Sequence, residues 1–425
     1  MKRLICWTLI LVMLLTAVPA MADNTKTSGQ YTYEIKGNGS ITITKFLGDS
    51  RSGDVYIPNM IDGYTVTAIG DEAFAQIDLK GCSVTLPDGI KSIGDKAFFD
   101  TGISAINLPS SLQHIGVGAF YNCTSCQFKL TPNHPYFAVI DKGLYDKTNK
   151  ELITYSYGGL PDFAIIQIPD GIKVIRGFAF AGNYKKRLII QLPSSLISIG
   201  DYAFAQGLDS QMGDNSWLQE ISGNLSNLKT IGEGAFMNCC VFNCHITMSA
   251  VETIENKAFY GSFVIFEDVR KPGKQSYSIV FDGSPLNQIG DEAFDRLNFD
   301  LGGSICNYFS IDTTRCSNIG IGNSGIGKLL INKNCFSPQL TTIPTGLNPK
   351  CSSLPSTVTA IQAQAYTNVV TNFRLSTSLT DIAVDAFPEG STFIVDAGSY
   401  AELWCSENGF GYSIEGQDNL DWLNN

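Results

Sequence analysis

The sequence has little positive charge and no long apolar run after its first 22 residues. Its 425 residues include 29 Lys and Arg against 40 Asp and Glu, which gives a formal net charge of −11. Because contacts from Lys and Arg to phosphate dominate nucleic-acid affinity, this balance argues against a nucleic-acid partner and against anionic membrane surfaces. A spanning helix needs roughly 18 to 20 successive apolar residues, so no membrane insertion is expected beyond residue 22.

Histidine is also scarce, with three residues in the chain. Cys123 and Cys126 have the CxxC spacing of a redox pair or of half a zinc site, but the sequence has no second CxxC. Cys123 lies three residues after Phe120, as Cys239 lies three after Phe236, so both occupy one position of a repeat. Buried structural thiols are therefore favoured, and neither a metal nor a cofactor is expected.

A second cysteine cluster consists of Cys239, Cys240 and Cys244, next to His245. Adjacent residues of a strand point to opposite faces, which argues against Cys244 and His245 as a nucleophile and its base. A disulfide between nearby coils is the alternative. Of the 12 cysteines, Cys6 would leave with a leader peptide; the remaining odd number cannot all pair within one chain, so the pairing stays open.

Residues 1–22 are typical of a secretory signal peptide. Lys2 and Arg3 supply the positive start, residues 9–15 a short apolar stretch, and residues 20–22 a small-x-small cleavage site. Cleavage would leave 27 basic against 40 acidic residues, a net charge of −13. An exported protein is expected, located outside the cell, on the cell surface or in the periplasm.

The phrase IGDEAF is the strongest signal in the sequence, because variants of it recur eleven times. Each copy has an Ile, a small residue four positions later and an aromatic residue five positions later. A unit this short cannot bury its own apolar face, so stacked units that share one continuous core are expected. The copies begin at Ile69, Ile93, Ile115, Ile175, Ile199, Ile231, Ile254, Ile289, Ile331, Ile361 and Ile382, and their aromatic residues are Phe74, Phe98, Phe120, Phe180, Phe204, Phe236, Phe259, Phe294, Phe336, Tyr366 and Phe387.

The residues around each phrase predict one coil of a solenoid that is mainly β, with short helical or 3-10 turns. Ile69, Ile93 and Ile115 are 24 and 22 residues apart, within the 20 to 29 residues of leucine-rich repeats. Ile106 and Leu108 alternate with polar residues, as in a strand with one buried face. A Pro often follows such a segment, and it marks where the strand stops because Pro has no backbone donor.

Two positions of the phrase carry small or acidic residues. Gly follows the Ile in six copies, but Arg176, Glu255, Gln362 and Ala383 fill the same position elsewhere, so this Gly is interpreted as allowing a close approach between coils, not a left-handed turn. The acidic residues are interpreted as solvated turns; a carboxylate ladder for acid catalysis or cations is the disfavoured alternative. They are Asp71, Asp95, Asp201, Glu233 and Asp291.

The segment from Gly320 to Gly325 fits the dinucleotide pattern GxGxxG, and Gly322 to Lys328 fits GxxxxGK. A phosphate-binding loop also needs a following helix, and the P-loop needs Ser or Thr after the Lys. Leu329 stands there instead. A turn of the solenoid is the favoured interpretation.

The longest interval between phrases holds two apolar segments around a polar stretch, which predicts a hairpin projecting from the stack near residues 131–160. Loops on a rigid scaffold often carry function, and exposed aromatic residues are frequent in interfaces. The alternative is that these aromatic residues cover the local coil surface. The candidate ligand contacts are Tyr136, Phe137, Tyr145, Tyr155 and Tyr157 in this insert, and Trp217 in a second insert.

The segments IGDEAF, LPSSLQHIGVGAFYNC and LPSSLISIGDYAF resemble the BspA-type leucine-rich repeat found in secreted and surface proteins of Bacteroides-like bacteria. The similarity covers roughly residues 31–413. It implies a right-handed solenoid with a parallel sheet and a role in adhesion or macromolecular binding, and it supplies no catalytic residues. The expected divisions are a signal peptide at 1–22, an N-terminal β cap at 23–65, repeats at 66–390 with the insert near 131–160 and a degenerate stretch near 295–328, and a last coil with C-terminal cap at 391–425.

The sequence therefore favours an exported non-enzymatic binding protein whose partner is a host or bacterial surface protein or a glycan. Two alternatives remain open. One is a secreted enzyme that uses the solenoid as a scaffold, and the other is a structural module of a surface assembly. The functional part of this expectation depends mostly on the family resemblance, because one fold can carry many functions.

Overall fold

The computed structural model describes residues 24–49, 53–182, 188–206, 218–239, 241–262, 276–281, 284–295, 308–310, 313, 315–323, 336–337 and 339–416. The expected signal peptide, Trp217, Cys240 and residues 331–335 of the phrase that begins at Ile331 lie outside these residues, whereas the aromatic residue of that phrase, Phe336, is described and buried.

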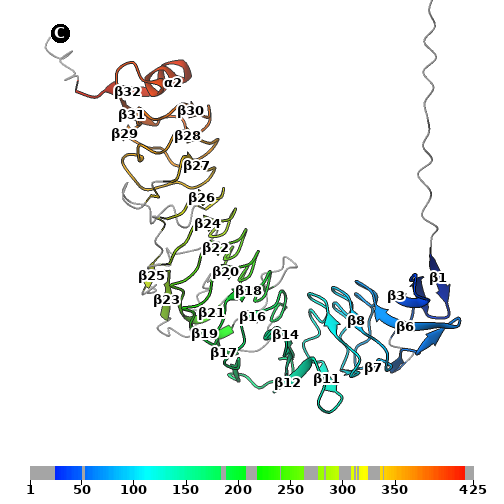
Figure 1. Ribbon diagram of the computed structural model, residues 1–425. Helices are drawn as coiled ribbons and strands as arrows, with labels where there is room; N and C mark the ends of the chain where they lie inside the picture. The colour runs from blue at the N-terminus through cyan, green and yellow to red at the C-terminus, as the bar shows by residue number, and fades with distance from the viewer. Residues whose placement is uncertain are drawn as a thin grey trace, which may run out of the picture.

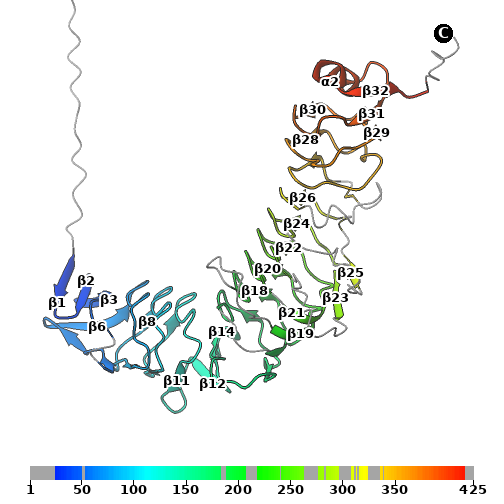
Figure 2. The ribbon, with the colours of Figure 1, turned by 180° about the vertical axis from the view of Figure 1, so that it is seen from behind.

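The chain forms a solenoid of short stacked strands, as the repeat predicted, and the solenoid is bent (Figure 1). A first block, residues 24–130, and a second block, residues 151–416, meet at residues 131–150. The buried apolar residues likewise fall into two clusters, one for each block. Two kinds of sheet run along the solenoid, and both views place one kind on the inside of the bend and the other on the outside (Figure 1, Figure 2). They are named here the inner and the outer sheets.

The inner sheets carry the phrase isoleucines, which pair in parallel register from coil to coil, as Ile69 does with Ile93. Antiparallel pairs occur only near the chain start and in the insert among the described strands. In the first block the inner strands are β1 (Thr25–Ser28), β2 (Tyr31–Ile35), β3 (Ser40–Phe46), β5 (Met60–Ile61), β6 (Tyr64–Ile69), β8 (Ser92–Ile93) and β10 (His114–Ile115). The junction holds β12 (Phe137–Ile140) and β13 (Gly143–Asp146), which extend the first inner sheet of the second block. The inner strands of the second block are β14 (Glu151–Tyr155), β16 (Val174–Ile175), β18 (Ser198–Ile199), β20 (Thr230–Ile231), β22 (Thr253–Ile254), β24 (Gln288–Ile289), β26 (Asn318–Ile319), β27 (Thr342–Ile343), β28 (Ala360–Ile361) and β30 (Asp381–Ile382).

The outer sheets precede each Pro corner, and their strands also pair in parallel. In the first block they are β4 (Val55–Tyr56), β7 (Ser83–Thr85), β9 (Ala105–Leu108) and β11 (Gln127–Leu130). In the second they are β15 (Ile165–Gln167), β17 (Ile189–Gln191), β19 (Leu218–Asn224), β21 (Val241–Thr247), β23 (Ser276–Val280) and β25 (Tyr308–Ser310), followed by β29 (Phe373–Arg374), β31 (Thr392–Val395) and β32 (Gly411–Ile414). Helix α2 (Tyr400–Asn408) closes the C-terminal end; Ser399 accepts at its N-terminus and Gly409 ends it in a left-handed conformation.

The phrase aromatic residues stack on one another through each core, as expected for a shared apolar column. In the first block the ring centroids of Phe46, Phe74, Phe98 and Phe120 are 4.8, 4.9 and 5.7 Å apart. In the second block the spacings from Tyr155 through Phe180, Phe204, Phe236 and Phe259 to Phe294 are 5.4, 5.1, 5.1, 5.1 and 5.2 Å. A break between Phe120 and Tyr155 coincides with the bend.

The phrase glycines permit close approach between coils, which confirms the interpretation from the sequence. A Cβ on Gly94 would collide with Asp71 of the preceding coil, its backbone N lying 2.5 Å away. The φ angle of Gly94 lies outside the left-handed region, so backbone conformation does not require glycine there. Lack of space does.

The acidic residues of the phrase are exposed, and they also bind the next coil. The Asp71 carboxylate accepts a hydrogen bond from the backbone N–H of Asp95 at 2.8 Å, and Asp95 accepts one from Val117 at 2.7 Å. Equivalent bonds join Asp201 to Glu233, Asn256 to Asp291, and Asp291 to Ile321. Each of these short acceptors faces a glycine in the following coil, whereas the longer Glu233 is followed by Glu255. The short acceptor of one coil and the glycine of the next coil therefore form a single contact between neighbouring coils.

Two of the described coils do not match the eleven copies of the phrase identified in the sequence. Ile319 and Ile343 occupy the phrase position and are buried, at 4% and 0% exposure. Asn323 replaces the small residue after Ile319, and its side-chain Oδ1 accepts the N–H of Phe294 at 3.0 Å, where a backbone carbonyl serves in other coils. The described start of the glycine-rich segment, residues 320–323, lies in a turn of this coil, where the N–H of Gly322 donates to the carbonyl of Thr345 at 2.5 Å; the remainder of the segment lies outside the described residues.

Candidate binding surface at the bend

The strands of the insert do not project from the stack as expected, although the turn between them, residues 147–150, is exposed. Strands β13 and β14 are buried and lie between the two blocks. Leu144 and Ile153 pack in the first core, whereas Tyr145 and Leu152 pack in the second. Because successive residues of a strand point to opposite faces, one hairpin serves both cores.

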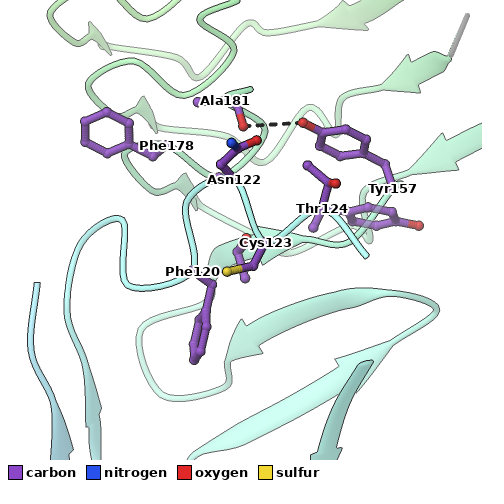
Figure 3. Close-up of a pocket in the computed structure, with 10 residues that line it drawn as sticks. Phe120, Asn122, Cys123, Thr124, Tyr157, Phe178 and Ala181 are labelled. Carbon is purple, nitrogen blue, oxygen red and sulfur yellow. Dashed lines mark hydrogen bonds between the residues drawn. The ribbon is translucent and has the colours of Figure 1, made fainter. Parts of the chain in front are cut away.

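Most of the proposed ligand contacts are therefore core residues. Phe137, Tyr145, Tyr155 and Tyr157 are only 2%, 2%, 6% and 3% exposed, so they offer no surface to a ligand. Burial raises the pKa of all three of these tyrosines. Tyr157 donates a hydrogen bond to the carbonyl of Ala181 at 3.4 Å (Figure 3). Tyr136 is half-buried against the first core.

The insert starts the second block in the way that the N-terminus starts the first. Leu152 pairs with Ile175 as Ile43 pairs with Ile69. Three residues later, the N–H of Tyr155 donates to Ala179 at 3.0 Å, and the N–H of Phe46 donates to Ala73 at 2.8 Å. In both places antiparallel strands precede the first parallel coil. The hairpin is an internal cap.

Arg176 joins the two blocks at the position where other coils have glycine. The preceding inner strand is β14, whose coil has no phrase turn at this position, so a side chain has room here. The insert deprives the Ile115 carbonyl of the N–H that the next coil would have supplied, and the Arg176 guanidinium donates to it instead at 2.7 Å. Arg176 also lies 3.7 Å from the Glu151 carboxylate.

The phrase turns of the two blocks touch each other, while the outer sheets do not pair. A Cβ on Gly118 would lie 3.1 Å from the ring of Phe178, and a Cβ on Gly177 would lie 3.0 Å from Val117. Among the described strands, β11 and β15 are both at sheet edges and have no ladder between them. The described inner sheets do not pair across the bend either, because β10 and β12 are end strands of their sheets. The two blocks therefore meet through their phrase turns.

Four half-buried rings form a strip across the bend, here called the aromatic strip: Phe99, Tyr121, Phe178 and Tyr202. Their centroids are 5.0, 5.1 and 5.4 Å apart in that order. The strip connects two coils of the first block to two of the second, although Tyr121 and Phe178 are far apart in sequence. It is separate from the fully buried aromatic columns.

Charged groups flank the aromatic strip. The ammonium of Lys96 lies 5.7 Å from the centroid of Phe178, within the range of a cation–π contact. The Tyr202 hydroxyl donates to Glu233 at 2.6 Å, and burial together with this bond raises the pKa of Tyr202 to about 12. Tyr202 therefore stays protonated at physiological pH, which preserves this bond.

The aromatic strip presents mainly ring edges, because neighbouring rings cover the faces of one another. Interplanar angles of 9° for Phe99 with Tyr121 and 14° for Phe178 with Tyr202 show this stacking. Ring edges next to charged groups suit a ligand that presents both apolar and polar groups. The sequence pattern missed the strip because its rings come from two positions, one residue after the core aromatic in the first block and two before it in the second.

The surroundings lack the groups expected of a catalytic centre. A crevice beside the strip has about 180 Å³ of empty space, open solvent included. It is lined by aromatic rings, alanines, Asn122, Cys123 and two threonines (Figure 3). Burial raises the pKa of the Cys123 and Cys126 thiols, which disfavours the reactive thiolate. The described part of the chain contains no cluster of three metal-ligating side chains and no helix suited to crossing a membrane.

Comparison with known proteins agrees with the repeat. The family model described as "BspA type Leucine rich repeat region" matches residues 54–156, 150–212 and 215–337, in six copies. A leucine-rich cell surface protein from Faecalibacterium prausnitzii A2-165 is 17% identical over 89% of this chain and 96% of its own, with a TM-score of 0.39. A leucine-rich repeat protein from Eubacterium ventriosum is 16% identical, over 92% and 95%, with a TM-score of 0.40. The pneumococcal vaccine antigen PcpA is 13% identical, over 93% and 99%, with a TM-score of 0.34. No curated protein matches.

Proposed function

Because the chain belongs to the BspA-type leucine-rich repeat family, we propose that it is an exported, non-catalytic protein that recognises a protein or glycan on a host or bacterial surface. The aromatic strip is the observation that carries this proposal. Partly exposed stacked rings in the concave side of a solenoid are a suitable contact surface, since the curvature of such folds creates extended concave faces.

Three features of the strip support recognition in preference to a purely structural role. The core columns already bury one ring in each coil beside the bend, so a second row is not needed to fill the interior there. The strip is flanked by a cation at Lys96 and an anion at Glu233, which adds directional contacts to an apolar centre. Aromatic residues are also enriched among the residues that dominate binding energies.

The direct test is binding of the purified mature protein to arrays of glycans and extracellular-matrix proteins. Saturable binding to at least one class is expected. No binding to either array, together with turnover of a substrate panel, would replace this proposal with the enzyme alternative.

A paired variant assigns any binding to the aromatic strip. Replacing Tyr121 and Tyr202 together by Ser should lower the affinity for the array ligand about tenfold or more, because two contact rings are removed. Tyr56→Ser is the matched control, since Tyr56 is 69% exposed but lies on the outer sheet of the first block. Its affinity should equal that of the wild type.

A further inference from the structure

A strand edge is left open where the insert interrupts the outer sheet. Strand β15 pairs with β17 on one side only, and no described strand pairs with its other side. An open strand edge, with unpaired backbone donors and acceptors, therefore lies part-way along the solenoid, at the bend, as well as at the two ends of the solenoid.

The hydrogen bonds between β15 and β17 identify which backbone groups of β15 are unused. Ala164 accepts from the N–H of Ile189, and the N–H of Ile168 donates to Gln191. Bonding groups alternate along a parallel strand, so Ala164, Ile166 and Ile168 face β17. The N–H and C=O groups of Ile165 and Gln167 consequently point to the open side.

The side chains beside this edge are apolar and exposed. Ile165 is 64% exposed and Phe163 is 47% exposed. Free edges are commonly blunted by Lys, Pro or a bulge, and β11, the end strand of the outer sheet in the first block, carries Lys129. Strand β15 contains Ile165, Ile166 and Gln167, and it has none of these devices.

The turn before β15 holds an aromatic residue where the chain elsewhere uses glycine. Gly89 and Gly171 occupy the third position of Pro-Asp-Gly turns with φ of 106° and 89°. In the matching turn, Pro161-Asp162-Phe163, the φ of Phe163 is 62°, and the same bond closes it, from the N–H of Ala164 to Pro161. Phe163 keeps a large apolar surface next to the open edge.

We propose that the open edge of β15 binds an extended segment of a partner protein, which adds to the outer sheet as a further strand. The unused groups require backbone amides in β geometry, which a glycan does not have. Phe163 and Ile165 favour an apolar residue on the outward face of that segment. The negative charge of the chain favours a neutral or basic segment. This interaction is independent of the aromatic strip, which lies on the other side of the bend.

A peptide with the sequence of strand β9 and its flanks, ISAINLPS, is a suitable probe because β9 occupies the equivalent place beside β11. Fluorescein-labelled peptide should bind the full mature protein saturably in fluorescence anisotropy. The peptide residues that correspond to Ile106 and Asn107 test whether the peptide binds as a strand paired with β15. N-methylation at Ile106 removes the N–H that faces β15 and should weaken binding about tenfold or more, whereas N-methylation at Asn107, which faces away, should leave it unchanged.

Variants of the protein give the reciprocal test. Gln167→Pro deletes the N–H that faces the open side and should weaken peptide binding about tenfold. Pro is tolerated in edge strands, and Gln167→Ala is the control that removes the side chain but keeps the N–H. If Gln167→Pro fails to fold, as judged by circular dichroism, the two methylated peptides still decide the question.

Three results would overturn the proposal. The peptide could fail to bind, it could bind with equal affinity whichever amide is methylated, or the protein could form a dimer that Gln167→Pro abolishes. The last result would assign the edge to a second copy of this chain. A loss of array binding in the Tyr121 and Tyr202 variant with peptide binding intact would leave this inference standing, so the two proposals fail separately.

Discussion

Replacing Gly232 by Ala should destabilise the solenoid, although the same change stabilises many proteins. A Cβ at this position would collide with the Asp201 carboxylate and would lie 2.7 Å from the Asp201 backbone N and 2.8 Å from the Gly200 carbonyl carbon. Two of these contacts are with backbone, which cannot rotate away. The coils would have to separate locally.

The magnitude follows from two destabilising contributions and one that offsets them. Overpacking costs about 1 to 3 kcal/mol, and moving the coils apart weakens the hydrogen bond from Glu233 N–H to Asp201, 2.9 Å long, which contributes about 1 kcal/mol. The smaller conformational freedom of Ala in the unfolded chain offsets about 0.4 to 1 kcal/mol. The net loss should be about 1 to 3 kcal/mol.

Chemical denaturation followed by circular dichroism, with hydrogen exchange of the neighbouring coils, measures this loss. Gly37→Ala is the matched control, because no atom would lie within 4 Å of its Cβ and its φ is not left-handed. In an Asp201→Ala background, Gly232→Ala should cost less, since one colliding group is gone. Equal stabilities of Gly232→Ala and Gly37→Ala, or strict additivity of the two changes at Asp201 and Gly232, would refute the proposed coupling between coils.

Three further changes test other parts of the structure. Phe204→Ala should lower the free energy of unfolding by about 3 to 5 kcal/mol, because Phe204 is fully buried between rings 5.1 Å away on both sides; an unchanged denaturation midpoint would exclude it as a core anchor. Arg176→Met should cost about 1 to 3 kcal/mol by leaving the Ile115 carbonyl without its donor, and hydrogen exchange should accelerate in the coils beside the bend and not at the C-terminal cap. Burial, against the opposing effect of Arg176, raises the pKa of Glu151, so ionised Glu151 disfavours folding as the pH rises through that pKa. Glu151→Gln should therefore raise the thermal midpoint relative to wild type at pH 7 and have no effect below the ordinary pKa of 4.5; a lower midpoint at pH 7 would show that the Arg176 pair outweighs burial.

The fold was predictable because its signal repeats. An Ile such as Ile93, a small residue and an aromatic such as Phe98 fill the same core positions in every regular coil, so eleven weak signals reinforce one another. The coil at Ile343 was missed since Asn348 stands where the aromatic residue is expected. Leu347, which is fully buried, stands where the small residue is expected.

The candidate site was harder to predict, because its residues gain meaning only from their positions in space. A polar stretch between two apolar segments predicts a hairpin, but not whether it projects or inserts; Tyr145 and Tyr155 are buried because a second core exists on the other side of the hairpin. The aromatic strip likewise depends on the contact between Tyr121 and Phe178, which the insert separates in sequence and the bend brings together.

Array binding of the double Tyr121→Ser and Tyr202→Ser variant, measured beside wild type and Tyr56→Ser, tests the proposed function most directly. Thermal midpoints measured in parallel show whether the variants are folded. Recognition through the aromatic strip predicts that wild type and Tyr56→Ser bind the same glycan or protein with the same affinity, while the folded double variant binds about tenfold more weakly or not at all. Undiminished binding by the double variant would contradict it.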